Sequence, residues 1–118
     1  MMLSPGDIIL IPIPFSDLTA QKRRPVLVLS NEDYNRRYQD IIVAAITSNV
    51  AEREYEVIIT NDEMAEGELK VVSAVRADKI YTLSQSIVVK KFGKVHGSIL
   101  TKVKAQLDSC LTEQTQLL

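Results

Sequence analysis

The sequence has few of the residues that usually build redox, metal or covalent sites. Its 118 residues include one cysteine, Cys110, one histidine, His96, and no tryptophan. A single cysteine excludes an internal disulfide and a multi-cysteine metal site, which fits a reducing compartment, so we expect a cytoplasmic protein. His96 precedes the predicted tail helix, where an exposed or capping imidazole is expected. Cys110 lies on that helix and is expected to be a small core residue.

An excess of charge of either sign is also lacking. The formal net charge is -1, so nonspecific wrapping of nucleic acid is not expected and an anionic partner must be met locally. The amino-terminal run MMLSPGDIILIPIPF has no basic leader, contains prolines and is too short to cross a bilayer. It therefore predicts a mature chain with no membrane partner.

Motifs that bind cofactors or metals are missing from the chain. There is no Walker loop, no dinucleotide glycine fingerprint, no GxSxG and no HExxH. A metal site made of His96 and scattered carboxylates stays open, although no ligand spacing supports it. We therefore expect no cofactor and no metal site.

Short apolar runs dominate the chain and predict β-strands. They lie at residues 7–14, 26–29, 41–46, 55–60, 71–75 and 87–92. The polar stretch 31–39 is expected to form a turn of helix, and Gly67 supplies the freedom that a tight turn requires.

Helical spacing appears only in the tail. Apolar residues recur every three to four positions, with Ser98 as a possible N-cap; they are Ile99 or Leu100, Val103, Leu107 and Leu111. The sequence therefore predicts a single domain over residues 1–118, mainly β, formed by a small, strongly bent antiparallel sheet or half-open barrel with a C-terminal helix. A doubly wound parallel sheet would need more helices.

Three polar clusters lie at the edges of apolar strands. They are Lys22, Arg23 and Arg24 before VLVL, Thr47 and Ser48 after IIVAAI, and Arg76 with Asp78 after VVSAV. Each alone has a structural explanation: a solvated charge run, a strand-ending hydroxyl turn and a surface ion pair. Together they suggest one rim of the sheet. Residues two apart on a strand point to the same side, so Arg76 and Asp78 are expected to face one spot.

These clusters carry a resemblance to a known family. The ordered segments GDIILIPIPFSDLT, KRRPVLVLSN, IIVAAITSN and VVSAVRADKIYTLSQS resemble the MazF/PemK (Kid) family of toxin endoribonucleases, the toxin half of type II toxin–antitoxin pairs. The most specific pieces are Gly6-Asp7, Arg24-Pro25, Thr47-Ser48 and Arg76-x-Asp78. The resemblance implies an SH3-like barrel with a C-terminal helix, usually a homodimer. It also implies metal-free cleavage of single-stranded RNA and a cognate antitoxin as partner.

The resemblance also implies roles for single residues. It transfers the family's active-site Arg and Thr to Arg24 and Thr47, and its acid/base pair to Arg76 and Asp78. Thr19, Lys22, Arg23 and Ser48 would bind the RNA. Some members have a histidine in the loop before the Arg-Pro step, whereas SDLTAQK has none, so a role for that imidazole has no counterpart here.

RNA cleavage by its own 2′-hydroxyl gives these residues a chemical logic. The hydroxyl must lose a proton, the charge on the five-coordinate phosphorus must be stabilised, and the leaving 5′-oxygen must gain a proton. Arg24 and Arg76 suit the second task because a guanidinium is a planar donor fork that holds its proton. Asp78 is the candidate base, although an adjacent Arg lowers its pKa. Thr47 would orient a phosphate oxygen or a water.

Two other interpretations stay open at the level of sequence. The first is a catalytically silent SH3-like barrel that binds RNA or a peptide, because such barrels host many functions. The second is a structural or interaction module whose three clusters are solvated charge. Cleavage with a cyclic phosphate product would separate the enzyme from the first, and salt-dependent RNA affinity would argue against the second.

Overall fold

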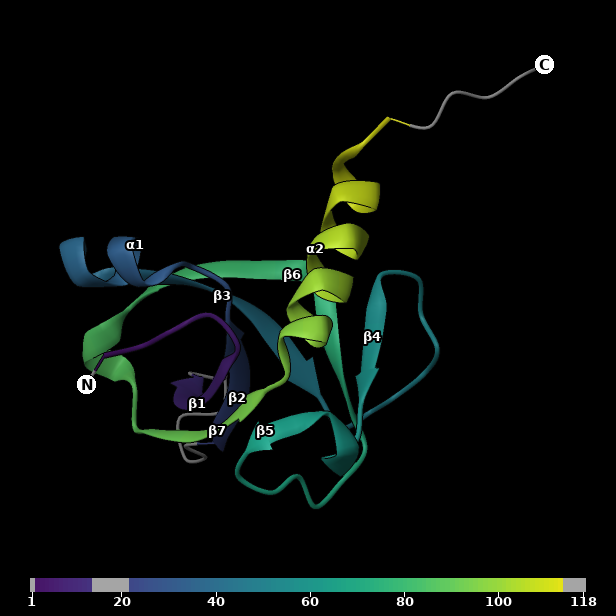
Figure 1. Ribbon diagram of the computed structural model, residues 1–118, viewed down its shortest axis with the longest axis horizontal. Helices are drawn as coiled ribbons and strands as arrows, with labels where there is room; N and C mark the ends of the chain where they lie inside the picture. The colour runs from purple at the N-terminus through teal and green to yellow at the C-terminus, as the bar shows by residue number, and fades with distance from the viewer. Residues whose placement is uncertain (1, 14–21, 114–118) are drawn as a thin grey trace.

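Figure 1 shows the computed structural model, which describes residues 2–13 and 22–113. The strands are β1 (Asp7–Ile13), β2 (Lys22–Val28), β3 (Asp40–Thr47), β4 (Glu56–Ile59), β5 (Met64–Glu66), β6 (Ser73–Ser84) and β7 (Lys90–Val95). The α-helices are α1 (Glu32–Arg37) and α2 (Gly97–Leu111), and two 3-10 turns lie at Asn61–Glu63 and Gln85–Ile87.

The strands form one curled sheet. Their order is β4-β6-β3-β2-β1-β7-β5, and each pairing in the described part of the chain is antiparallel. The sheet bends into a half-open barrel, and α2 rises from it at one side (Figure 1). The predicted fold class, a strongly bent antiparallel barrel with a C-terminal helix, is confirmed.

Each face of the sheet packs against its own apolar cluster, and strand β2 contributes to both. Leu27 belongs to the cluster that contains Ile99 and Val103 of α2, whereas Val26 and Val28 belong to the second cluster. Successive side chains of a strand point to opposite faces, so the run Val26 to Val28 serves two cores. This fixes which face each charged residue at the start of β2 can occupy.

A large bulge bends β6. Ala44 of β3 lies opposite Ile80, and its neighbour Ala45 lies opposite Arg76. One step along β3 therefore spans four steps along β6, and residues 77–79 form the bulge. A bulge bends its strand and re-aims side chains, and bulges are common beside active sites. It lies directly after Arg76 and includes Asp78.

The strand predictions hold best for the first half of the chain. Strands β1, β3 and β4 lie where the apolar runs predicted them. Strand β2 begins at Lys22 rather than 26, because Lys22 to Arg24 pair with β1. The basic residues are thus part of the strand. Gly67 has a φ of 79°, which L side chains rarely adopt, as the turn prediction required.

The second half departs further from the predicted elements. Strand β6 covers Ser73–Ser84 instead of 71–75, since pairing with β3 carries it through polar positions. The run expected at 87–92 begins in a 3-10 turn, and β7 starts at Lys90. Strand β5, three residues inside a polar stretch, was not predicted.

The tail helix forms, but two predictions about it are wrong. Its N-cap is His96, whose exposed imidazole makes no capping hydrogen bond, and Ser98 lies inside the helix. Cys110 is exposed instead of buried, and Leu111 is 76% exposed. The physical reason is that α2 extends past the sheet, so its last turns have no strand beneath them (Figure 1).

Candidate active site

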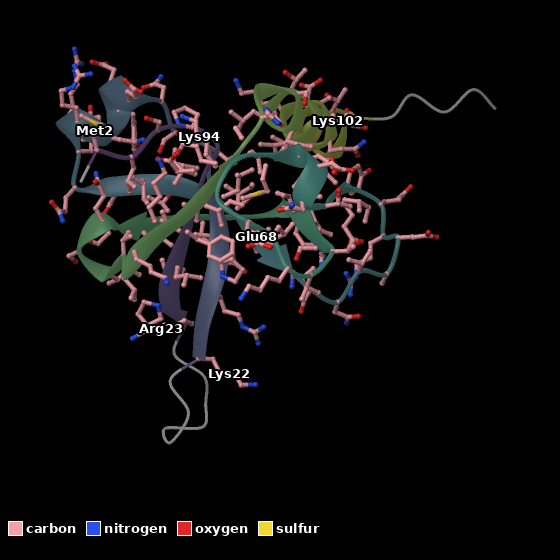
Figure 2. The ribbon with its side chains drawn as sticks, turned by 60° about the horizontal axis from the view of Figure 1, so that its bottom comes forward. Met2, Lys22, Arg23, Glu68, Lys94 and Lys102 are labelled. Carbon is pink, nitrogen blue, oxygen red and sulfur yellow. The ribbon has the colours of Figure 1, made fainter. Side chains whose placement is uncertain are left out.

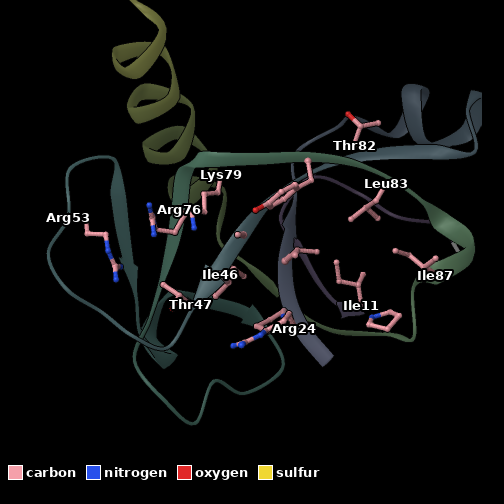
Figure 3. Close-up of a pocket in the computed structure, with 15 residues that line it drawn as sticks. Ile11, Arg24, Ile46, Thr47, Arg53, Arg76, Lys79, Thr82, Leu83 and Ile87 are labelled. Atoms are coloured by element: carbon pink, nitrogen blue, oxygen red, sulfur yellow. The ribbon is translucent and has the colours of Figure 1, made fainter. Parts of the chain in front are cut away.

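A cavity of about 630 Å³ opens over strands β1, β2, β3 and β6. One part of its wall is polar and cationic, formed by Arg24, Arg53, Arg76, Lys79 and Thr47. The other part is largely apolar and includes Ile11, Pro12, Pro25, Val26, Leu83 and Ile87. Figure 3 shows the labelled cations gathered toward one end and Ile11, Leu83 and Ile87 toward the other. Among the described residues that line it, four carry positive charge and none is acidic.

Strand β2 delivers Arg24 to this cavity. Arg24 is half-buried and lines the wall together with Val26, two positions further along the same face. Lys22 shares that face by strand alternation, whereas Arg23 points to the opposite one. Both are exposed at the start of β2, where Figure 2 shows them. The basic run is therefore divided between two faces of the sheet.

The end of β3 delivers Thr47. Its Oγ1 accepts a hydrogen bond of 3.0 Å from the backbone N–H of Asn49, a turn that hydroxyl residues commonly make at strand ends. This bond orients the side chain and leaves the hydroxyl hydrogen able to be donated. Ser48 lies in the following bend, where it is exposed.

Arg76 and Asp78 form a two-point ion pair. The Nε of Arg76 donates to Oδ1 of Asp78 at 3.0 Å, and Nη2 donates to Oδ2 at 2.9 Å. The hydrogen bonds from Arg76 lower the pKa of Asp78, and the same bonds raise the pKa of Arg76. Asp78 is thus an ionised carboxylate with both oxygens engaged, which makes it a weak proton acceptor.

The structure brings one residue from each predicted cluster to the cavity. Arg24, Thr47 and Arg76 all line it. In the described part of the chain, the predicted residues that do not line it are Lys22, Arg23, Ser48 and Asp78. Thr19 lies outside the described residues. The predicted rim is therefore a cavity wall, and Asp78, which is bonded to Arg76, does not line it.

Sequence reasoning missed three lining residues: Arg53, Lys79 and Tyr81. Arg53 lies in the loop between β3 and β4, where no residue pattern marks it. No pattern in the sequence shows which face of its strand the ring of Tyr81 occupies. It is 50% exposed at the cavity wall, whereas Tyr34 of α1 and Tyr38, the C-cap residue of α1, pack their tilted rings together with centroids 4.8 Å apart.

The described residues hold neither a metal-binding cluster nor a membrane-spanning helix. Within residues 2–13 and 22–113, no group of three or more His, Cys, Asp or Glu side chains is placed to hold a metal ion. In the same part of the chain, no helix is both long and apolar enough to span a membrane.

The fold matches solved structures of toxins. An endoribonuclease in complex with its cognate antitoxin, from a mycobacterial species, superposes with a TM-score of 0.76 at 19% identity, covering 92% of this chain and 94% of that one. MazE-MazF from Deinococcus radiodurans gives 0.78 at 22% identity, covering 94% and 97%. The Mycobacterium tuberculosis toxin MazF-mt6 gives 0.71 at 22%, covering 87% and 93%.

Sequence comparison identifies the family. Curated protein sequences gave no match to this chain. The family model described as PemK-like, MazF-like toxin of type II toxin-antitoxin system matches residues 4–111. That match spans most of the chain and includes every described residue that lines the cavity. The chain therefore belongs to the PemK-like, MazF-like toxin family of type II toxin–antitoxin systems.

Proposed function

We propose that this protein is a metal-independent endoribonuclease, the toxin of a type II pair, acting in the cytoplasm as a single domain over residues 1–118. It cuts single-stranded RNA with sequence selectivity and leaves a 2′,3′-cyclic phosphate. The observation that carries the proposal is the gathering of Arg24, Arg76 and Thr47, from three different strands, in one cavity that four cations line. RNA is polyanionic, and these side chains supply the positive charge that its cleavage needs.

The proposed reaction is an internal transesterification. The 2′-oxygen gives its proton to a water molecule or to Asp78 and bonds to phosphorus, the bond from phosphorus to the 5′-oxygen breaks, and that oxygen takes a proton from water. Arg24 and Arg76 stabilise the added negative charge on the phosphoryl oxygens, because a guanidinium fork matches two of them at once. Thr47 donates a hydrogen bond from its hydroxyl to one of these oxygens. Rigid strands hold all three groups, which favours precise placement.

Asp78 has two roles in this proposal. Its two hydrogen bonds to Arg76 hold that guanidinium in one orientation. The same bonds lower the pKa of Asp78, so its capacity to accept the 2′-hydroxyl proton is small. We therefore assign Asp78 chiefly to positioning Arg76. It serves as the base only when Arg76 turns from it toward the phosphate.

The bases and the flanking backbone have their own contacts. Tyr81 offers an exposed ring at the cavity, and bases of single-stranded RNA stack on such rings. The apolar end of the cavity suits a second base. Lys22, Arg23 and Ser48 are exposed and adjoin the lining residues Arg24 and Thr47 in sequence. We assign them contacts with the RNA backbone further along, those of Arg23 being on the other face of β2. Thr19 has the same proposed role.

The proposed partners are a second copy of the chain and an antitoxin. The exposed Leu111 at the end of α2 is an apolar surface that a homodimer would cover. An acidic, disordered antitoxin segment laid across Lys22 to Arg24 would exclude RNA. The mycobacterial and Deinococcus structures described above contain an antitoxin chain, which supports this second partner.

Cleavage of a long transcript in excess chelator tests the proposal. We expect discrete cut sites within a short shared sequence and 2′,3′-cyclic phosphate ends. A protein that retards RNA without cutting it would instead be a catalytically silent barrel. Activity that is lost in chelator and restored by a divalent ion would contradict the mechanism.

A further inference from the structure

The loop between β3 and β4 brings Arg53 to the cavity through an unusual backbone. Glu52 has a φ of 51° and Tyr55 a φ of 63°, values that side-chain-bearing residues rarely adopt and that cluster at functional sites. The Tyr55 carbonyl accepts a 2.9 Å hydrogen bond from the N–H of Ala77, in the β6 bulge. The loop is thereby fixed to the same bulge that follows Arg76.

A buried carboxylate holds Arg53 at both ends. The side chain of Glu56 is 1% exposed, and that of Arg53 is 33% exposed. Oε2 of Glu56 accepts a 2.8 Å bond from the backbone N–H of Arg53, and Oε1 lies 3.4 Å from its Nη1. Nη1 also donates to the carbonyl of Asn49 at 3.1 Å. The guanidinium is thus oriented before any ligand arrives.

The outer edge of this guanidinium is still available. All the hydrogen bonds that Arg53 makes from its side chain to the described residues use Nη1. Nε and Nη2 together carry three more N–H donors, arranged as the fork that binds phosphate oxygens in two-point fashion. Glu56 also lies opposite Arg76 in the pairing of β4 with β6. The acid that orients Arg53 is therefore a direct neighbour of Arg76.

We propose that Arg53 binds a second RNA phosphate, adjacent to the one being cut, and that Glu56 positions its guanidinium for this contact. The inference rests on the proposed function for the identity of the ligand. It accounts for a partly exposed arginine, oriented by a buried acid on a strained loop, at a cavity where Arg24 and Arg76 are assigned to the reacting phosphate. A purely structural Arg53 would only tie the loop to Glu56.

Binding of an uncuttable oligonucleotide tests this proposal without depending on cleavage. The probe is a labelled single-stranded RNA of mixed sequence with every 2′-hydroxyl methylated, so it keeps its phosphates and loses the attacking group. Arg53→Ala should weaken its binding about tenfold, the scale for losing a charged hydrogen bond. The slope of log affinity against log salt should fall by about 0.7. Arg53→Lys should keep the slope and lose part of the affinity, because lysine keeps the charge without the fork.

A double-mutant cycle tests the role of Glu56. Glu56→Gln should weaken binding in the wild-type background and have little effect in the Arg53→Ala background, since it acts through that side chain. The matched control is Arg37→Ala, which removes an exposed arginine on α1 that pairs with Asp33 at 3.4 Å. It should bind the probe as wild type does. If Glu56→Gln unfolds, the two Arg53 variants still decide the phosphate contact.

The outcomes separate this inference from the proposed function. If Arg53→Ala and Arg53→Lys both bind the probe as Arg37→Ala does, with the wild-type salt slope, the proposed contact between Arg53 and a phosphate is wrong. The proposed endoribonuclease activity would still stand if the wild type cuts the transcript. A wild type that binds the probe but cuts no transcript would overturn the enzyme and leave the Arg53 result standing. A melting temperature lowered by Arg53→Ala with binding unchanged would show a structural role only.

Discussion

Two charged regions of this molecule differ in what their ion pairs do. In the first, Nζ of Lys91 lies 3.2 Å from Oδ1 of Asp7 and 3.2 Å from Oε2 of Glu66, so one cation joins strands β1, β5 and β7. In the second, four cations line a cavity, and the acids Glu56 and Asp78 lie behind two of them. Paired charges join three strands in the first region, whereas the second region gathers four cations at one cavity.

Burial sharpens the contrast. The Asp7 side chain is 1% exposed, and Lys91 supplies its counter-charge. The hydrogen bond to Asp7 in turn raises the pKa of Lys91. Removing that lysine leaves a buried carboxylate with little compensation. The cavity cations are at least partly accessible, and Asp78, the partner of Arg76, has a side chain that is 30% exposed. We therefore expect substitutions in the first region chiefly to lower the stability of the fold. Substitutions in the second region should chiefly lower RNA binding or the cleavage rate.

The largest expected effect is on cleavage. Arg76→Ala should lower the single-turnover rate by roughly 100-fold or more, the usual scale for losing one contact to developing charge. Melting should change little, because the ion pair that it breaks is partly exposed. A quenched single-turnover assay measures the cleavage rate, with Arg37→Ala as the matched control. A variant that melts early yet cuts at the wild-type rate would make the Arg76–Asp78 pair purely structural.

Next in size is a loss of stability. Lys91→Met should reduce the free energy of unfolding by about 1–3 kcal/mol, since Asp7 then keeps mainly its 2.8 Å bond from the N–H of Ser4. Glu66→Gln is the control, because it removes only the exposed partner of the same lysine and should cost less. Denaturant unfolding measures both. Equal stability of Lys91→Met and wild type would remove the contrast between the two regions.

A smaller effect is expected on RNA binding. Tyr81→Ala should weaken affinity for single-stranded RNA about tenfold, the scale for losing one stacked base. Tyr38→Ala makes a fair comparison because Tyr38 is 55% exposed and is the C-cap residue of α1, outside the cavity lining. Fluorescence anisotropy with the methylated probe measures both. Equal losses from the two variants would show that the ring at the cavity has no special part.

The smallest effect concerns stability and pH. The pKa of Asp78 in the folded protein lies below its ordinary value of 3.8, chiefly because of the hydrogen bonds from Arg76. The pair therefore stabilises the fold above about that pH, and the contribution is lost as pH falls through the lowered pKa. Asp78→Asn should be less stable than wild type at neutral pH by about 1 kcal/mol or less. The difference in stability should narrow as the pH falls below 3.8, and a difference that stays constant from neutral pH into acid would contradict this cause.

Strand ends were the predictable part of the site. Arg24, Thr47 and Arg76 adjoin apolar runs, and both the runs and the family resemblance pointed to them. Arg53 was not predictable, because its place depends on the left-handed backbone at Glu52 and Tyr55 and on a bond to the β6 bulge. Such a long-range arrangement leaves no local pattern. The roles assigned to these residues stay predictions.

The same distinction applies to the fold. Apolar periodicity showed which face of the tail helix packs, as the buried Ile99 and Val103 confirm. It could not show where the sheet beneath ends, so Cys110 was wrongly placed in the core, and Leu111, the last residue of the apolar spacing, is exposed. The bulge in β6 likewise reflects its pairing with β3, which the residues of β6 alone do not specify.

Cleavage by Arg24→Ala tests the central claim most directly. Arg24 lines the cavity from β2 and is not part of the Asp7–Lys91–Glu66 region. In excess chelator, the wild type should cut a long transcript to 2′,3′-cyclic phosphate ends. Arg24→Ala, folded by circular dichroism, should cut it roughly 100-fold more slowly or worse. Wild-type cleavage by folded Arg24→Ala, at the same sites and rate, would contradict the account.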